Sequence, residues 1–172
     1  GYGLRLFPKS LFLLIDFHAD GLKITLFTPE EFSVNAGGVY SRVLGKAPDN
    51  TGGAMMDGWI MQDIMDRNRM DETDSRVARI PPLTRHEAPR IREALALNTE
   101  AEVRVTDPVS GFSLTAQVSR SDLCRIFEER GLFVAMNRAM DRALSVAGIR
   151  EREEERIIAV LMVGEYSAIP CI

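Results

Sequence analysis

Residues 11–15 read Leu-Phe-Leu-Leu-Ile, an unbroken apolar run that ends at Asp16. A strand that is covered by helices on both faces of a sheet has this composition. The turn signal Asp20-Gly21 follows, and in residues 22–27 Leu, Ile and Leu then alternate with Lys, Thr and Phe. The stretch therefore predicts a β-hairpin with a short loop, and it puts Asp16 at the end of a central strand.

Strand and helix patterns follow one another along the rest of the chain. Further strands are expected at 32–34, 39–44, 102–106, 112–118 and 157–163, and helices at 57–65, at 84–98, after Ser119 or Ser121, and at 132–146. Thr84 and Glu87 form a capping-box pattern for the second helix, but Pro89 lies late in it, so we expect an irregular start. The mixture predicts an α/β fold.

Composition excludes several classes of protein. The chain has 172 residues, 45% of them hydrophobic, which suits one globular unit or one with a small inserted subdomain. A net charge of -4 gives no general attraction to nucleic acid or to acidic membranes. The longest apolar run is far shorter than a membrane span.

The two cysteines, Cys124 and Cys171, lie far apart and in no metal-ligand spacing. We therefore expect reduced thiols and a cytoplasmic or another reducing intracellular location.

The residues alone leave some roles open. The end of a buried strand is a favoured place for a functional carboxylate, yet Asp16 would look the same as a residue that caps a turn. His18 has only His86 as a companion, so a loop histidine is favoured over a metal ligand. Trp59 is better explained by packing than by partner binding.

Short motifs recur in the order of one known family. Residues 118–123 (Val-Ser-Arg-Ser-Asp-Leu) are similar to I-T-R-x-x-F, and residues 143–149 are similar to A-L-x-x-A-G-L. Residues 156–170 are similar to I-D-x-V-L-L-V-G-G-S-S-R-I-P. These three motifs belong to the DnaK-type, seventy-kilodalton heat-shock chaperones, which the chain resembles.

The N-terminal part resembles the same family in the same register. Residues 2–4 are similar to A-Y-G-L, and residues 13–27 to V-L-V-F-D-L-G-G-G-T-F-D-V-S-I-L. Residues 50–57 are similar to H-L-G-G-E-D-F-D, and residues 90–96 to R-A-K-R-x-L-S.

The resemblance implies the second lobe of an actin-like ATPase domain with a ribonuclease-H-like fold. Residues 1–52 and 117–172 would form its base subdomain, and residues 53–116 an inserted α+β upper subdomain. The chain would then be a fragment of a longer protein, with ATP or ADP and magnesium bound between two lobes.

The resemblance also implies roles for individual residues. Asp16 would orient magnesium-bound water rather than bind the metal directly. The other nucleotide-binding positions carried over are His18, Ala19, Asp20 and Gly21 at the phosphates, Gly52 and Gly53 near the ribose and phosphates, Arg92 beside the adenosine, and Gly164 and Glu165 at the adenine.

Several of these positions depart from the family pattern. His18, Ala19 and Asp20 stand where the family has three glycines, and Gly21 where it has threonine. Lys23, Pro89, Ala96 and Glu165 replace further conserved types. A carboxylate about 4 Å from a phosphate at a surface-like dielectric costs roughly 4 kcal/mol, so we expect Asp20 to oppose nucleotide and hydrolysis to be impaired.

Three functions are compatible with this pattern. The first is an ATP-driven chaperone, with the other lobe of the domain, a J-domain co-chaperone and a nucleotide-exchange factor as partners. The second is a catalytically degenerate relative that acts as a scaffold, regulator or co-chaperone. The third is another actin-fold ATPase or kinase, which the motifs Ser119-Arg120 and Ile169-Pro170 argue against.

Overall fold

A computed structural model describes residues 10–30, 40–70, 86–109, 111–150, 156–169 and 171. The predicted strand at 32–34, the motif at 2–4 and the capping Thr84 lie outside these residues. Contacts divide the chain into two compact units, Gly1–Gly52 with Val134–Ser167, and Gly53–Phe133 with Ala168–Ile172.

One of the two expected subdomain boundaries differs from this division. The boundary after Gly52 coincides with the expected one, but the second falls after Phe133 instead of residue 116. The helix at 120–129 joins the second unit because it packs on the helix at 53–67. Residues 168–172 also belong to the second unit instead of the base.

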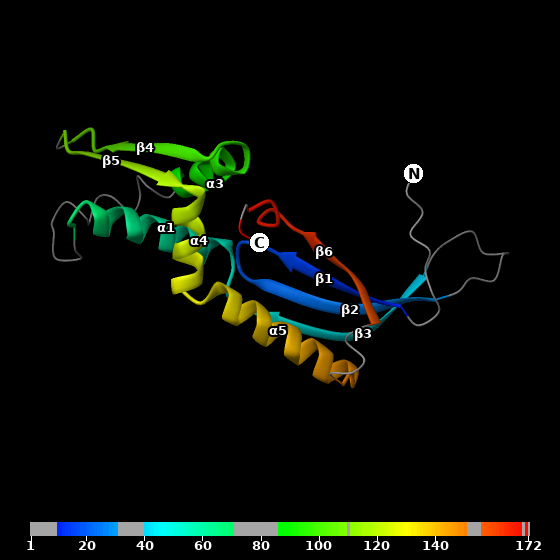
Figure 1. Cartoon of the computed structure of the whole chain (residues 1–172). Helices are drawn as coiled ribbons and strands as arrows, with labels where there is room; N and C mark the ends of the chain where they lie inside the picture. The colour runs from blue at the N-terminus through cyan, green and yellow to red at the C-terminus, as the bar shows by residue number, and fades with distance from the viewer. Residues whose placement is uncertain are drawn as a thin grey trace. The chain divides into compact units, whose positions relative to one another are not determined.

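The first unit is built on a four-stranded mixed sheet in the order β3-β2-β1-β6 (Figure 1). Its strands are β1 (Leu11–Phe17), β2 (Leu22–Glu30), β3 (Tyr40–Asp49) and β6 (Ile157–Val163). The strands β1, β2 and β3 pair antiparallel in sequence order, and β6 pairs parallel with β1. The expected hairpin and the α/β class are confirmed.

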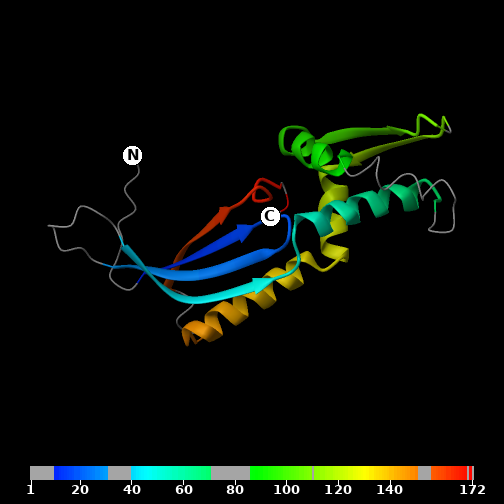
Figure 2. The same cartoon turned by 180° about the vertical axis from the view of Figure 1, so that it is seen from behind.

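The apolar run of β1 is buried, as its composition predicts, since Leu11, Leu13 and Phe17 are each at most 3% exposed. Helix α5 (Leu132–Ala147) runs beside β3 (Figure 2). A Cβ atom at Gly45 of β3 would lie 3.0 Å from the backbone nitrogen of Ala147, so glycine allows this close approach.

The strand predicted at 157–163 is present as β6, but it is less buried than its strongly apolar composition suggests. It lies at the edge of the sheet, with β1 as its only strand neighbour among the described residues. Its large exposed apolar side chains are 40–53% accessible: Ile158, Val160, Leu161 and Val163. Apolar edges of this kind usually pair with further structure.

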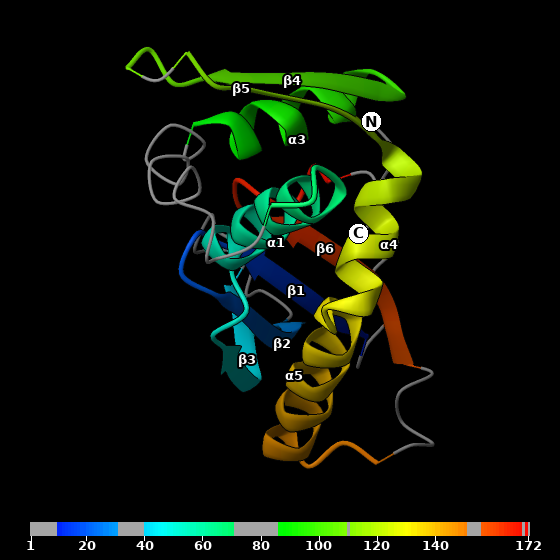
Figure 3. The same cartoon turned by 90° about the vertical axis from the view of Figure 1, so that its left-hand side faces the viewer.

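The second unit consists of a two-stranded sheet and the helices that pack around it (Figure 3). Its elements are α1 (Gly53–Arg67), α3 (Glu87–Leu97), β4 (Glu100–Thr106), β5 (Ser113–Ser119) and α4 (Arg120–Glu129). Helix α3 packs on β4, and α1 packs on both α3 and α4. Trp59 is partly buried, and its ring centroid lies 6.4 Å from that of Phe127, so the ring makes a packing contact within the unit.

Two helix starts differ from the sequence prediction for local reasons. Helix α1 begins at Gly53, four residues before the expected start at residue 57. Helix α3 begins at Glu87, which puts Pro89 in its first turn. Backbone N–H groups in a first turn have no intrahelical acceptor, so proline is tolerated there.

The start of α4 is capped as the sequence allows. The Ser119 side chain accepts a hydrogen bond from the Asp122 N–H, and the Asp122 carboxylate accepts one from the Ser119 N–H. Of the two candidate serines, Ser119 is therefore the cap.

The expectation of two reduced thiols is wrong, because Cys124 and Cys171 form a disulfide within the second unit. Their distance in sequence did not prevent pairing, since the chain after β6 returns to α4 and brings the two Cα atoms within 5.4 Å. A disulfide is uncommon in a reducing compartment. None of the described helices is long and apolar enough to cross a membrane.

Candidate functional site

The candidate site in the first unit begins where β1 ends. Asp16 is the penultimate residue of β1, and His18 opens the turn that leads to β2. The Nε2 atom of His18 lies 2.8 Å from Oδ1 of Asp16, with the two side chains 55% and 24% exposed. The carboxylate that was expected to face magnesium-bound water is therefore already paired with an imidazole.

The hairpin turn at 18–21 is closed by the backbone. The N–H of His18 donates to the carbonyl of Gly21 over 2.9 Å. The N–H groups of Ala19 and Asp20 find no acceptor among the residues that the structure describes, and both residues are exposed. Two neighbouring N–H groups of this kind can donate hydrogen bonds to a small anion, although the negative charge of the Asp20 carboxylate would repel that anion.

A second turn, between β3 and α1, packs against the hairpin turn. A Cβ atom at position 52 would lie 2.6 Å from the carbonyl oxygen of Ala19, and one at position 21 would lie 2.5 Å from that of Asp49. The backbones of the two turns therefore touch. Gly21 and Gly52 are explained by this packing, whether or not a phosphate binds.

Asp49 and Arg142 hold this second turn in place, a role that sequence reasoning missed. The Asp49 carboxylate accepts hydrogen bonds from the Thr51 N–H over 3.1 Å and from Nη2 of Arg142 over 3.1 Å. Burial alone would raise the pKa of Asp49, but these bonds lower it below its usual value. The sequence pattern Asp-x-Thr could have indicated the turn. The contact with Arg142 could not be predicted in this way, because Arg142 lies far away in the sequence, on α5.

A third turn meets the end of β1 from the other side. Gly164 follows β6 with a φ of 95°, and a Cβ atom there would lie 2.8 Å from the carbonyl carbon of Phe17. The Ser167 hydroxyl donates to the Gly164 carbonyl over 2.8 Å, which closes the turn. Glu165 is exposed, and Tyr166 is buried with its ring near that of Phe17.

These contacts bring eight of the ten predicted positions to one end of the first unit's sheet: Asp16, His18, Ala19, Asp20, Gly21, Gly52, Gly164 and Glu165. The strand register requires this, since β1, β3 and β6 end where β2 begins.

The other two positions, Gly53 and Arg92, belong to the second unit. Gly53 is the first residue of α1 and is buried. Arg92 on α3 donates from Nε to Oδ1 of Asp57 over 2.6 Å, and its side chain is 10% exposed. The arginine that was expected beside adenosine is thus bound to a carboxylate of its own unit.

No group of three or more His, Cys, Asp or Glu side chains able to hold a metal ion occurs in the described ranges. No family model matches this sequence, and no curated protein matches it. The resemblance to DnaK-type chaperones rests on the motifs alone.

Proposed function

We propose that this chain is the second lobe of the actin-like nucleotide-binding domain of a DnaK-type molecular chaperone, and that ATP or ADP binding is coupled to client handling. The observation that carries the proposal is the meeting of three turns with Asp16 at one end of the sheet. Ligands of open α/β sheets bind in the crevice outside strand ends of this kind.

Some residues at the candidate site suit nucleotide binding, and one opposes it. The free N–H groups of Ala19 and Asp20 are donors for phosphate oxygens, and the Asp16 carboxylate would lie on the magnesium side. Bound magnesium would neutralise phosphate charge. Against this stands the Asp20 carboxylate, whose repulsion of a phosphate at about 4 Å is roughly 4 kcal/mol.

A second candidate is a degenerate relative that keeps the fold as a scaffold, regulator or co-chaperone. Two contacts favour it, since the His18 imidazole lies 2.8 Å from the Asp16 carboxylate and Arg92 forms an ion pair with Asp57. Each would have to open or reorganise before its residue served a nucleotide. The geometry therefore supports nucleotide binding better than hydrolysis.

A lobe of this kind requires covering structure and partners. The exposed apolar side chains of β6 support a lobe that is one part of a larger fold. The proposed partners are the other lobe, a J-domain co-chaperone and a nucleotide-exchange factor.

Calorimetric titration of Mg-ATP and Mg-ADP into the protein with both lobes tests the proposal, with phosphate release followed in the same samples. Binding at micromolar concentration with phosphate release supports the chaperone motor, and binding without release supports a nucleotide sensor. Absence of binding overturns nucleotide binding and leaves the scaffold.

A variant that restores glycine in the turn sharpens this test. His18→Gly, Ala19→Gly and Asp20→Gly together remove the imidazole from Asp16 and the negative charge from the turn. We expect the triple variant to bind Mg-ATP at least about tenfold more tightly, since one removed charge contact is worth more than 1.4 kcal/mol. Asp141→Asn, which removes one negative charge from an exposed position on α5 outside the three turns, is the control.

A further inference from the structure

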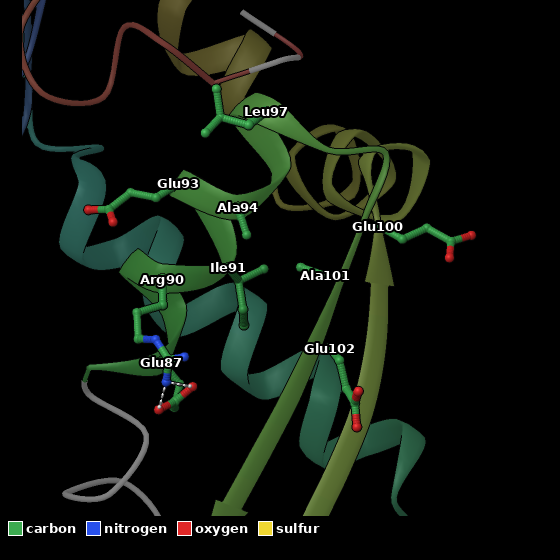
Figure 4. Close-up of a pocket in the computed structure, with 9 residues that line it drawn as sticks. All are labelled: Glu87, Arg90, Ile91, Glu93, Ala94, Leu97, Glu100, Ala101 and Glu102. Atoms are coloured by element: carbon green, nitrogen blue, oxygen red, sulfur yellow. Dashed lines mark hydrogen bonds and ion pairs between the residues drawn. The ribbon is translucent and has the colours of Figure 1, made fainter.

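A groove of about 460 Å³ lies between α3 and β4 of the second unit (Figure 4). Its floor is apolar, because Ile91, Ala94 and Ala101 line it. Ile91 is 2% exposed and Ala101 is 8% exposed, so this floor is continuous with the packed interior of the unit. The groove contains none of the candidate nucleotide positions.

The rim of this α3–β4 groove is negatively charged. Four glutamates line it, Glu87, Glu93, Glu100 and Glu102, with one arginine, Arg90, and the carboxylates of Glu93 and Glu100 point outward from the rim (Figure 4). Arg90 is paired with Glu87, because its Nη1 donates to the two carboxylate oxygens of Glu87 over 2.9 and 3.1 Å. The groove therefore carries an excess of negative charge.

The carboxylates of the rim differ in whether they have a hydrogen-bond or ion-pair partner. Glu100 accepts a hydrogen bond from Gln117 over 2.7 Å, and Glu102 lies 4.0 Å from Arg104, with both side chains well exposed. Glu93 is exposed and has no ion pair or hydrogen bond within the described part of the chain. Glu93 is thus the rim charge most available to an incoming cation.

An exposed apolar side chain stands at one end of the groove. Leu97, the last residue of α3, is 86% exposed. It is the most exposed large apolar side chain in the described ranges, and it lies beside an apolar floor. Apolar surface within a charged rim is the composition of a protein-binding surface.

We propose that the α3–β4 groove docks a basic amphipathic segment of a partner protein. Apolar side chains of that segment would lie on the floor and on Leu97, and its Lys or Arg side chains would reach Glu93 and Glu102. The negative charge of the groove favours a basic occupant. A second copy of this chain would bring its own negatively charged rim, and nucleic acid would bring its phosphates, so the groove would repel both. The proposal does not depend on nucleotide binding.

Fluorescence anisotropy with a labelled, amidated peptide of repeating Lys-Leu-Ala tests the proposal on the whole protein. The matched probe replaces each Lys with Glu, and spermine serves as a probe of charge alone. We expect the basic peptide to bind, the acidic peptide not to bind, and spermine to compete only weakly. Binding should weaken at higher ionic strength and should not change with Mg-ATP.

Variants locate the binding. Glu93→Lys should weaken binding about tenfold or more, whereas Glu128→Lys on α4, with the same change of charge outside the groove, should weaken it less than about twofold. Leu97→Ala should weaken it about threefold or more. Circular dichroism checks that each variant folds. Equal losses in the two charge variants, full affinity in Leu97→Ala, or spermine competing as well as the peptide would each overturn the proposal. So would self-association that protects the groove.

Discussion

Arg92 of α3 and Asp57 of α1 form a two-point ion pair inside the second unit. Nε of Arg92 donates to Oδ1 over 2.6 Å and Nη2 to Oδ2 over 3.3 Å, and the side chains are only 10% and 17% exposed. The pair joins two helices through residues that lie 35 positions apart in the sequence. Arg92 therefore has a structural task that does not involve a nucleotide.

Replacing Arg92 should lower stability even without nucleotide. Lysine keeps the charge but loses the planar fork, so Arg92→Lys should cost about 1–2 kcal/mol of unfolding free energy. Arg92→Ala, which leaves Asp57 in a half-buried place, should cost about 3 kcal/mol. Urea unfolding measures both. Arg90→Lys, at a side chain 73% exposed, is the control and should change little. An Arg92→Ala protein as stable as the wild type would contradict the structural role.

Gly164 and Gly58 should respond to alanine in opposite directions. Gly164 has a φ of 95° and faces the backbone of Phe17, so Gly164→Ala should cost about 2 kcal/mol or more. Gly58 lies within α1 with open space around it, so Gly58→Ala should raise stability by about 0.5–1 kcal/mol. Thermal unfolding of the pair measures this, and a neutral Gly164→Ala would show that the turn after β6 is not held against β1.

Local pattern was enough to predict most elements of the fold. The apolar run at 11–15, the turn after it and the strands expected at 102–106 and 112–118 are each signalled by adjacent residues, and the structure contains them. Asp107 illustrates this, because its carboxylate accepts a hydrogen bond from the Val109 N–H within the turn that the residue types predict.

What the sequence did not predict depends on distant contacts. Strand β3 continues through Gly45 to Asp49 because α5 packs on it, and no residue near position 45 signals this helix. The edge position of β6 is equally non-local, since a composition suited to a central strand does not specify how many neighbours the strand has. The side-chain partners of Asp16, Arg92 and Cys124 likewise became visible only in the fold.

The disulfide should account for a large share of the second unit's stability. Cys124 and Cys171 are 47 residues apart in the sequence, and in the chain-entropy treatment a loop of this length contributes about 4 kcal/mol. Cys171→Ser should therefore lower the unfolding free energy by about 2–4 kcal/mol under oxidising conditions. With reductant present, wild type and variant should become equal. Two titratable thiols in the native protein without reductant would contradict the disulfide.

Acid should weaken the contact between α1 and α4 through Asp122. Its carboxylate accepts hydrogen bonds from the Ser119 N–H and hydroxyl, and Nη2 of Arg67 donates to it over 2.6 Å. Burial raises the pKa of Asp122, but these interactions outweigh it and lower the pKa to about 2. Because the folded pKa lies below the unfolded value, the stabilisation is fully present above about pH 4 and is lost as the pH falls towards 2.

Asp122→Asn measures this contribution. The variant should be less stable than the wild type by about 1–2 kcal/mol at neutral pH, and the difference should shrink towards pH 2, where the wild-type carboxylate is protonated too. Asp141→Asn, at an exposed position on α5, is the control, and its unfolding free energy should depend on pH in the same way as that of the wild type. If the Asp122→Asn difference stayed constant down to pH 2, a lost hydrogen-bond geometry, and not the carboxylate charge, would be the cause. The Asp122 carboxyl carbon shift, followed by NMR through the same titration, would then have its midpoint near the usual aspartate value instead of near 2.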